Sequence, residues 1–188
     1  MAFYFDKFQF MELKKEIRKE VRRRIKELDT EVRNMASKAI FDEIEKLPVF
    51  HQAHCIALFA ALGDEVPTQY ALDRWPMLGK RIVVPRVEGD VMHFLDYSPD
   101  TMQVGAFGIE EPMGDSVCLA QDIDLIIVPA RAFTRRGERL GRGGGFYDKY
   151  MSLPDFRAHK TGICFECQLF DELPTAEYDV LVDEVVAR

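Results

Sequence analysis

Long apolar runs and cysteines are scarce in this chain of 188 residues. The longest unbroken apolar run, residues 55–62, has eight residues, whereas a membrane-spanning helix needs about 18 or more. The aromatic N-terminus has no basic lead-in and is interrupted by Asp6 and Lys7, so it does not read as a secretory signal. Four cysteines are too few for a disulfide scaffold. We therefore expect a cytoplasmic protein with reduced thiols that neither crosses a membrane nor is exported.

Positive charge is also in short supply overall. The 25 basic and 32 acidic residues leave a formal net charge of −7, so the chain offers no global positive field to duplex DNA, RNA or an anionic membrane. Its length and its 47% hydrophobic content fit one globular domain spanning residues 1–188. An anionic ligand must therefore be met by a local cluster of basic residues.

One segment departs from this acidic average. Five of the 12 glycines lie within residues 137–145, and residues 131–149 carry six basic and two acidic side chains, a local charge of +4. Because glycine lets backbone amides approach an oxyanion closely, residues 137–148, here called the glycine–arginine loop, favour phosphate binding. The loop lacks the closing Gly-Lys-Ser/Thr of a Walker loop and the third glycine of the dinucleotide fingerprint. A flexible surface loop is the structural alternative.

Hydrophobic periodicity predicts the fold. Apolar residues at spacings of three and four indicate two helices, over 10–28 and 32–47, which form an N-terminal helical hairpin. Short apolar runs predict strands at 55–60, 81–85, 91–97, 124–130, 161–166 and 180–186. A crossover helix within 67–78 makes the first two strands parallel, whereas residues 98–121 are poor in regular signals. The predicted fold is a single three-layer α/β domain with a mostly parallel sheet, in which ligands bind beyond the carboxyl ends of the strands.

Two groups of charged side chains near the expected site are candidates for ligand binding. Asp148 follows the glycines and is placed to hold Mg²⁺ on nucleotide phosphates, with Asp179 or Asp183 as a second carboxylate. Helix capping is the structural alternative for Asp148. Lys14 and Arg18, with Arg22, lie at intervals of four on the first helix and form a basic ridge, for which solvated surface is the alternative.

Three further features have a structural and a functional interpretation. Glu65 follows a strand at a turn where its carboxylate could meet a ligand's donors or cap a helix. Cys164 and Cys167 form a single CxxC, whereas a structural zinc site needs four ligands, so we interpret both as core or edge thiols. His51 and His54 are interpreted as surface residues.

Eight segments, taken in order, resemble the 5-formyltetrahydrofolate cyclo-ligase family, also called 5,10-methenyltetrahydrofolate synthetase. They are KKEIR (14–18), DEVPT (64–68), VPR (84–86), FGIEEP (107–112), DLIIVPARAF (124–133), RLGRGGGFYDKY (139–150), GICFECQ (162–168) and LPTAEYDVLVDEVV (173–186). The resemblance covers residues 12–186. It leaves residues 1–11 as an N-terminal extension that contains Phe3, Tyr4, Phe5 and Phe8.

The resemblance implies an ATP-dependent, Mg²⁺-requiring cyclisation of 5-formyltetrahydrofolate to 5,10-methenyltetrahydrofolate, with release of ADP and phosphate. In the family's mechanism the formyl oxygen takes the γ-phosphoryl group, and the bridge nitrogen then attacks the activated carbon. The implied partners are small-molecule folate and ATP, without nucleic acid or membrane, and the implied state is a monomer or weak homodimer. A non-catalytic folate- or nucleotide-binding module of the same fold is the alternative function.

The resemblance also assigns roles to residues. The implied ATP-binding residues are Lys14, Arg18, Arg139, Leu140, Gly141, Arg142, Gly143, Gly144, Gly145, Phe146 and Tyr147. The implied folate-binding residues are Ala60, Glu65, Gly143, Gly144, Gly145, Phe146 and Tyr147. Arg142 and Tyr147 are implied as catalytic residues, and Asp148 and Asp179 as magnesium ligands.

The chain departs from the family pattern at four positions. Gly144 stands where some members carry lysine, so a cationic contact there must come from another residue such as Arg142 or Arg139. Phe146 stands where tyrosine is common, which removes a hydroxyl and keeps the ring. Thr134 and Tyr178 replace a frequent aspartate and histidine.

Overall fold

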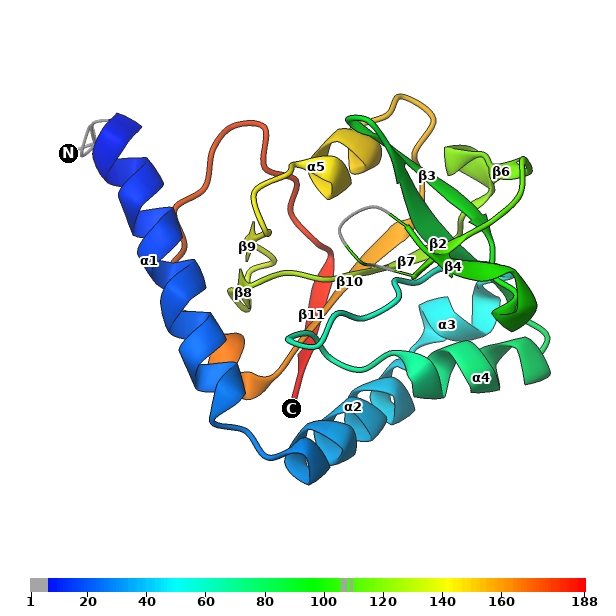
Figure 1. Cartoon of the computed structure of the whole chain (residues 1–188), viewed down its shortest axis with the longest axis horizontal. Coiled ribbons are helices and arrows are strands. Elements are labelled where there is room, and N and C mark those ends of the chain that lie inside the picture. Colours follow the sequence, from blue (N-terminus) through cyan, green and yellow to red (C-terminus); the bar gives the residue numbers. More distant parts are fainter. Residues whose placement is uncertain (1–6, 106–107, 109) are drawn as a thin grey trace.

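A seven-stranded sheet forms the centre of the computed structural model, which describes residues 7–105, 108 and 110–188 (Figure 1). Its order is β11-β10-β7-β1-β2-β3-β6. The strands are β1 (Cys55–Ala57), β2 (Arg81–Glu88), β3 (Val91–Asp96), β6 (Val117–Cys118), β7 (Leu125–Val128), β10 (His159–Cys164) and β11 (Glu184–Ala187). Neighbours from β11 to β2 pair in parallel, whereas β3 and β6 pair antiparallel at one edge. The predicted mostly parallel sheet and the β2–β3 hairpin are confirmed.

Helices cover both faces of this sheet and produce three layers (Figure 1). They are α1 (Lys7–Lys26), α2 (Thr30–Ile44), α3 (Pro48–Gln52), α4 (Gln69–Met77) and α5 (Phe146–Met151). Successive strand side chains point to opposite faces. Ile56 of β1 therefore packs in one core with residues of α1 to α4, whereas Ala57 packs in a second core with Tyr150 and Met151 of α5. The predicted three-layer α/β fold is confirmed.

The two predicted N-terminal helices are present with shifted bounds. The first begins at Lys7 and Asp29 is the N-cap of the second, which ends at Ile44. Pro48 does not end the second helix but begins α3, because proline is well suited to a first helical turn. In Figure 1, α1 runs along the left side and α2 along the lower edge. Phe8 lies in the first turns of α1, and Phe3, Tyr4 and Phe5 of the N-terminal extension lie outside the described residues.

The last predicted strand is shorter than expected. Only Glu184–Ala187 joins the sheet, beside β10. The preceding backbone is engaged elsewhere, since Val180 N donates to Asp148 Oδ1 at 3.0 Å and Val182 N donates to the Gly137 carbonyl at 2.9 Å. The first half of the predicted strand therefore supports the glycine–arginine loop instead of extending the sheet.

Short elements occupy two regions where the sequence shows no clear periodicity. Within residues 98–121 lie η1 (Pro99–Thr101), the antiparallel pair β4 (Met102–Val104) and β5 (Glu110–Pro112), β6, and the start of η3 (Ala120–Asp122). The pair β8 (Ala132–Phe133) and β9 (Arg139–Leu140) precedes α5, and η4 (Glu166–Gln168) follows β10. Strands of two or three residues are too short to show a period, which explains why the sequence did not predict them.

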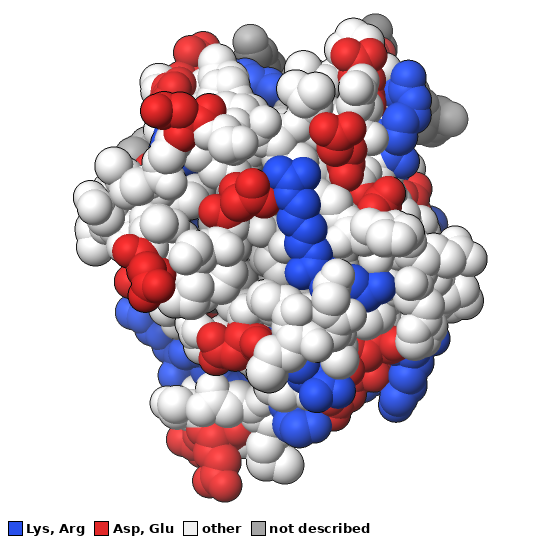
Figure 2. All heavy atoms as spheres, turned by 90° about the vertical axis from the view of Figure 1, so that its right-hand side faces the viewer, with Lys and Arg blue, Asp and Glu red and all other residues white. Residues whose placement is uncertain are grey.

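Cysteines and histidines take the structural roles predicted for them. All four cysteines are free, and Cys164 is buried at the end of β10 while Cys167 is half-buried in η4. His51 and His54 are exposed. On the face shown in Figure 2, basic and acidic side chains of the described residues are interspersed without a large area of one sign. Within the described part of the chain, no helix is both long and apolar enough to span a membrane.

Gly162 of β10 provides a test of the packing. A Cβ atom at this position would lie 2.5 Å from Cε1 of Phe133, whose side chain is fully buried. We expect Gly162→Ala to lower the free energy of unfolding by about 1–3 kcal/mol, because a buried ring must move to make room. Urea denaturation measures this change. Gly63→Ala is the control, since no described atom lies within 4 Å of its Cβ position; equal losses in both variants would refute the prediction.

Candidate functional site

A pocket of about 650 Å³ opens beyond the carboxyl ends of β1 and β7. The segment that follows β1 contributes Phe59 and Ala60, and the segment that follows β7 contributes Pro129 and Ala130. This is where parallel α/β sheets generally bind ligands. Every residue to which the family resemblance assigns a role lines this pocket: Lys14, Arg18, Ala60, Glu65, Arg139, Leu140, Gly141, Arg142, Gly143, Gly144, Gly145, Phe146, Tyr147, Asp148 and Asp179.

The glycine–arginine loop leads from β9 into α5 and takes backbone angles that only glycine adopts readily. Gly143 has φ +112° and Gly145, the N-cap of α5, has φ +69°, values that strongly favour glycine. A Cβ on Gly143 would also lie 3.7 Å from the guanidinium of Arg18. Residues 142–145 are exposed, but the loop contacts Arg18 of α1 and lines the pocket, which favours the phosphate-binding prediction over a flexible surface loop.

Two cations of α1 contact other segments that line the pocket. Arg18 Nε donates to the Gly141 carbonyl at 2.9 Å, and Lys14 Nζ lies 3.0 Å from Asp179 Oδ2. Burial, followed by the charge of Arg131, lowers the pKa of Arg18. Arg22, by contrast, is exposed and does not line the pocket. The solvated-surface alternative for the basic ridge therefore applies to Arg22 and not to Lys14 or Arg18.

Arg139 and Tyr147 present unpaired donors within the described part of the site. The Arg139 side chain is 3% exposed, and its Nη2 lies 2.5 Å from Asp148 Oδ1. Its Nε and the Tyr147 hydroxyl are buried without a hydrogen-bond partner among the described residues. Burial and the charge of Glu65 raise the pKa of Tyr147, so its hydroxyl stays protonated. Buried donors normally have partners, so these two are suited to an acceptor-rich ligand.

A chain of alternating charges links the loop to the turn after β1. Arg142 Nη2 lies 2.5 Å from Asp64 Oδ1, and Arg142 Nε lies 2.8 Å from Glu65 Oε1. The other oxygen of Asp64 pairs with the buried guanidinium of Arg131. Glu65 Oε2 accepts a hydrogen bond from Leu62 N, so this carboxylate does not cap α4. The arrangement holds Arg142 at the mouth of the pocket.

The pKa values of this chain follow its ion pairs. Burial acts to raise the pKa of Asp64, but its bonds to Arg142 and Arg131 outweigh burial and hold the pKa below the ordinary value. Burial acts to lower the pKa of Arg142, but Glu65 and Asp64 raise it overall. The sequence did not assign roles to Asp64 or Arg131, because their partnership spans 67 residues and has no local signature.

An apolar wall completes the pocket, and the sequence did not predict it. Its members come from α1, β2 and β3 and from the segments that follow β1 and β7: Met11, Phe59, Leu62, Pro85, Val87, Met92, Pro129 and Ala130. Glu111 and Tyr178 also line the pocket. The sequence held one signal for this wall: residues directly after β1 and β7 are expected to line a ligand site, since such sites lie at the carboxyl ends of parallel strands.

Both predicted magnesium ligands, Asp148 and Asp179, contact cations and backbone amides. Asp148 contacts Arg139 and Val180 N instead of capping α5, and Asp179 contacts Lys14 and Ala176 N. Among the described residues, no group of three or more His, Cys, Asp or Glu side chains could hold a metal. Mg²⁺ usually takes one or two carboxylates together with phosphate oxygens and waters, and the assignment of Asp148 and Asp179 to this ion stays a prediction. Asp183 lies outside the pocket and pairs with Lys160.

Comparison with known proteins identifies the family. The model of the 5-formyltetrahydrofolate cyclo-ligase family matches residues 10–188. The chain belongs to that family. The Escherichia coli K12 5-formyltetrahydrofolate cyclo-ligase is 34% identical, over 74% of this chain and 80% of the relative. The Haemophilus influenzae cyclo-ligase is 32% identical, over 72% and 76% of the two chains.

Solved structures of cyclo-ligase relatives share the fold. A 5,10-methenyltetrahydrofolate synthetase from Aquifex aeolicus aligns with a TM-score of 0.82 and 34% identity, over 93% of this chain and 89% of that chain. The synthetase from Mycoplasma pneumoniae aligns with a TM-score of 0.75 over 92% and 97% of the two chains, and its 23% identity supports the fold alone. The fold and the family predicted from the sequence are both confirmed.

Asp64 provides a test of the charge chain. We expect Asp64→Asn to lower the free energy of unfolding by about 2–3 kcal/mol at pH 7, because it leaves the buried Arg131 without a carboxylate. The loss is smaller than for a fully buried pair, since the Asp64 side chain is 27% exposed. Urea denaturation at a series of pH values measures it.

The pH dependence of this effect has a defined sign. The folded-state pKa of Asp64 is below the ordinary 3.8, so its contribution is present above pH 3.8 and is lost as the pH falls through the folded-state value. The difference between wild type and Asp64→Asn should therefore shrink in acid. Asp155→Asn, at an exposed site, is the control. A difference that stays constant with pH would contradict the assignment.

Proposed function

We propose that this protein uses ATP to cyclise 5-formyltetrahydrofolate to 5,10-methenyltetrahydrofolate, releasing ADP and phosphate through a phosphorylated formyl intermediate. The observation that carries the proposal is the single pocket that joins the cationic glycine–arginine loop to an apolar wall. Family membership supports the reaction class. One pocket with a phosphate-binding side and an aromatic, apolar side matches the two substrates of this reaction.

ATP is proposed to bind between α1 and the glycine–arginine loop. Lys14, Arg18, Arg139 and Arg142 line this part of the pocket and supply positive charge for the phosphates. The loop backbone approaches closely because its glycines carry no side chain. Phosphoryl transfer asks a protein mainly to position the groups and to neutralise charge, and these residues are suited to both tasks.

The position of Gly144 explains one departure from the family pattern. A Cβ atom there would lie 2.7 Å from Cε2 of Phe146, so the phenyl ring occupies the space that a longer side chain at 144 would need. A lysine at this position would require the ring to move. The cationic contact in this chain is therefore proposed to come from Arg142 and Arg139.

The folate is proposed to lie against Ala60, Glu65, Phe146 and Tyr147. Glu65 is paired with Arg142, so we propose that Arg142 turns toward the phosphates when both substrates bind and leaves this carboxylate to the folate. The protonated Tyr147 hydroxyl is available to donate to the formyl or phosphoryl oxygen. Arg142 and Tyr147 are the proposed catalytic residues because both lie where the two substrates would meet.

Asp148 and Asp179 are proposed to hold Mg²⁺ together with phosphate oxygens. When bound, the ion would neutralise charge on the transferring phosphoryl group. Lys14 and Arg139, which pair with these carboxylates, would then be free to contact the nucleotide.

Turnover by the purified protein tests the proposal. With Mg²⁺ and ATP, we expect 5-formyltetrahydrofolate to yield a product that absorbs in the near ultraviolet, together with ADP. Omission of ATP, or chelation of the metal, should abolish the reaction. Ligand-induced thermal stabilisation without turnover would instead support the non-catalytic binding module.

Arg142→Ala tests the phosphate contact. We expect the affinity for ATP to fall by about 10- to 100-fold, because the variant removes a charged hydrogen-bond donor, and we expect a smaller change for the folate. Calorimetric titration of each ligand measures both affinities. Arg22→Ala, which removes an exposed arginine outside the pocket, should leave both unchanged. Equal losses for ATP and folate in Arg142→Ala would indicate a structural role instead.

A further inference from the structure

The pocket has two chemically different ends. Its cations come from α1 and the glycine–arginine loop. The other end is formed by Pro85 and Val87 of β2 and Met92 of β3, and α1 and these strands lie on opposite sides of α5 in Figure 1. Among the described residues that line the pocket, the charged side chain at this apolar end is Glu111 on β5.

Glu111 is a buried acid without a cationic partner among the described residues. It is 7% exposed, and its Oε1 accepts one hydrogen bond, from Val87 N at 3.2 Å. Glu65 differs from it, since both of its oxygens are engaged by Arg142 and Leu62 N. Gly105 packs directly against Oε2 of Glu111, and any side chain at 105 would occupy the carboxylate's position. The glycine at 105 therefore provides the space that the Glu111 carboxylate occupies.

A buried carboxylate with a single neutral donor destabilises a protein unless a ligand completes its bonding. The ligand group that fits is a pair of adjacent N–H donors, because a carboxylate accepts two parallel hydrogen bonds. Of the two proposed substrates, the folate carries such a pair, as the 2-amino group and N3–H of its pteridine ring. The remainder of the ring is suited to Pro85, Val87 and Met92.

We propose that Glu111 binds the 2-amino and N3–H edge of the pteridine ring, an inference that rests on the proposed function. Bound in this way, the ring has its pyrimidine edge at the β5 end of the pocket. Its opposite edge, which carries the N5-formyl group, then points toward Arg142 and the phosphates. Glu111 is thus a specificity-determining residue that also orients the reacting group.

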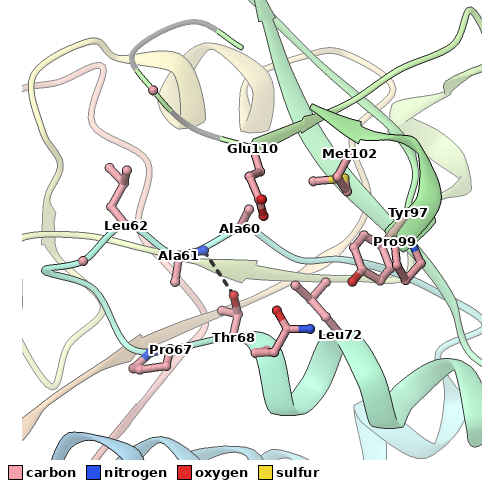
Figure 3. A pocket seen from close by; sticks show the side chains of 13 residues that line it. Ala60, Ala61, Leu62, Pro67, Thr68, Leu72, Tyr97, Pro99, Met102 and Glu110 are labelled. Atoms are coloured by element: carbon pink, nitrogen blue, oxygen red, sulfur yellow. Dashed lines mark hydrogen bonds between the residues drawn. The ribbon is translucent and has the colours of Figure 1, made fainter. Parts of the chain in front are cut away.

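The neighbouring residue Glu110 is a matched control. Successive side chains of a strand point to opposite sides, so Glu110 and Glu111 face different spaces. Figure 3 shows Glu110 pointing into a second pocket of about 530 Å³, with Met102 and Leu72 around it. Glu110 is exposed and does not line the first pocket. The same substitution at 110 and at 111 therefore changes the charge equally, but only the substitution at 111 alters the lining of the first pocket.

Calorimetric titration of Glu111→Gln tests the inference. With 5-formyltetrahydrofolate we expect affinity to fall by about 10- to 100-fold, as for the loss of a charged hydrogen bond. A 2-desamino analogue of this folate keeps N3–H but lacks the amino donor, so the substitution should lower its affinity less than that of the natural folate, and the affinity for ATP should stay unchanged. Glu110→Gln should behave as wild type with all three ligands.

A stability measurement separates binding from structural support. Replacement of an unpaired buried charge by a neutral isostere should leave the melting temperature of the ligand-free protein unchanged or higher. Gly105→Ala, which displaces the carboxylate without removing it, should also weaken the natural folate more than its analogue. This second variant decides the question if Glu111→Gln does not fold.

Three outcomes would overturn the inference. The first is wild-type affinity of Glu111→Gln for 5-formyltetrahydrofolate, and the second is an equal loss of affinity for the folate and for its 2-desamino analogue. In both cases, turnover by the wild-type protein would leave the proposed function intact. Wild-type protein that binds ATP but no folate would overturn the proposed function, and this inference with it.

Discussion

Pairing between carboxylates and the cations of the pocket is the interaction on which the site depends. A cluster of basic side chains repels itself, and burial makes each charge more costly. Here Asp179 pairs with Lys14, Asp148 with Arg139, and Asp64 with both Arg142 and Arg131. These carboxylates allow a cationic loop to exist, already folded, inside a chain with net charge −7.

The same pairs tie together segments that are far apart in sequence. Lys14 joins α1 to the segment before β11, and Arg142 joins the loop to the turn after β1. Asp148 receives the Val180 amide, which removes that residue from the sheet. Polar contacts thus join the segments that line the pocket, while apolar packing holds the sheet beneath it. The hydrophobic cores build the platform and the ion pairs position the functional groups.

Some polar groups are left unsatisfied within this arrangement. Arg139 Nε and the Tyr147 hydroxyl have no hydrogen-bond partner among the described residues, and Glu111 has one neutral donor. Natural proteins depart from complete polar satisfaction mainly at functional sites, where a ligand supplies the missing partner. Within the pocket, the donors of Arg139 and Tyr147 lie with the cations, and the carboxylate of Glu111 lies at the apolar end. The two ends of the pocket therefore differ in the ligand groups that they are suited to bind.

The sequence by itself determined six of the seven strands of the central sheet, the glycine–arginine loop and the family, because these depend on local patterns of residues. It also singled out Lys14, Arg18, Glu65, Asp148 and Asp179, which the fold then gathered in one pocket. Only the tertiary structure decided the partners Asp64 and Arg131, the shortened β11, the apolar wall and the burial of Glu111. The physical reason is that each of these depends on contacts between segments that are distant in sequence. Packing decides whether such a residue faces solvent, the sheet or the pocket, and no periodic pattern in the sequence records the outcome.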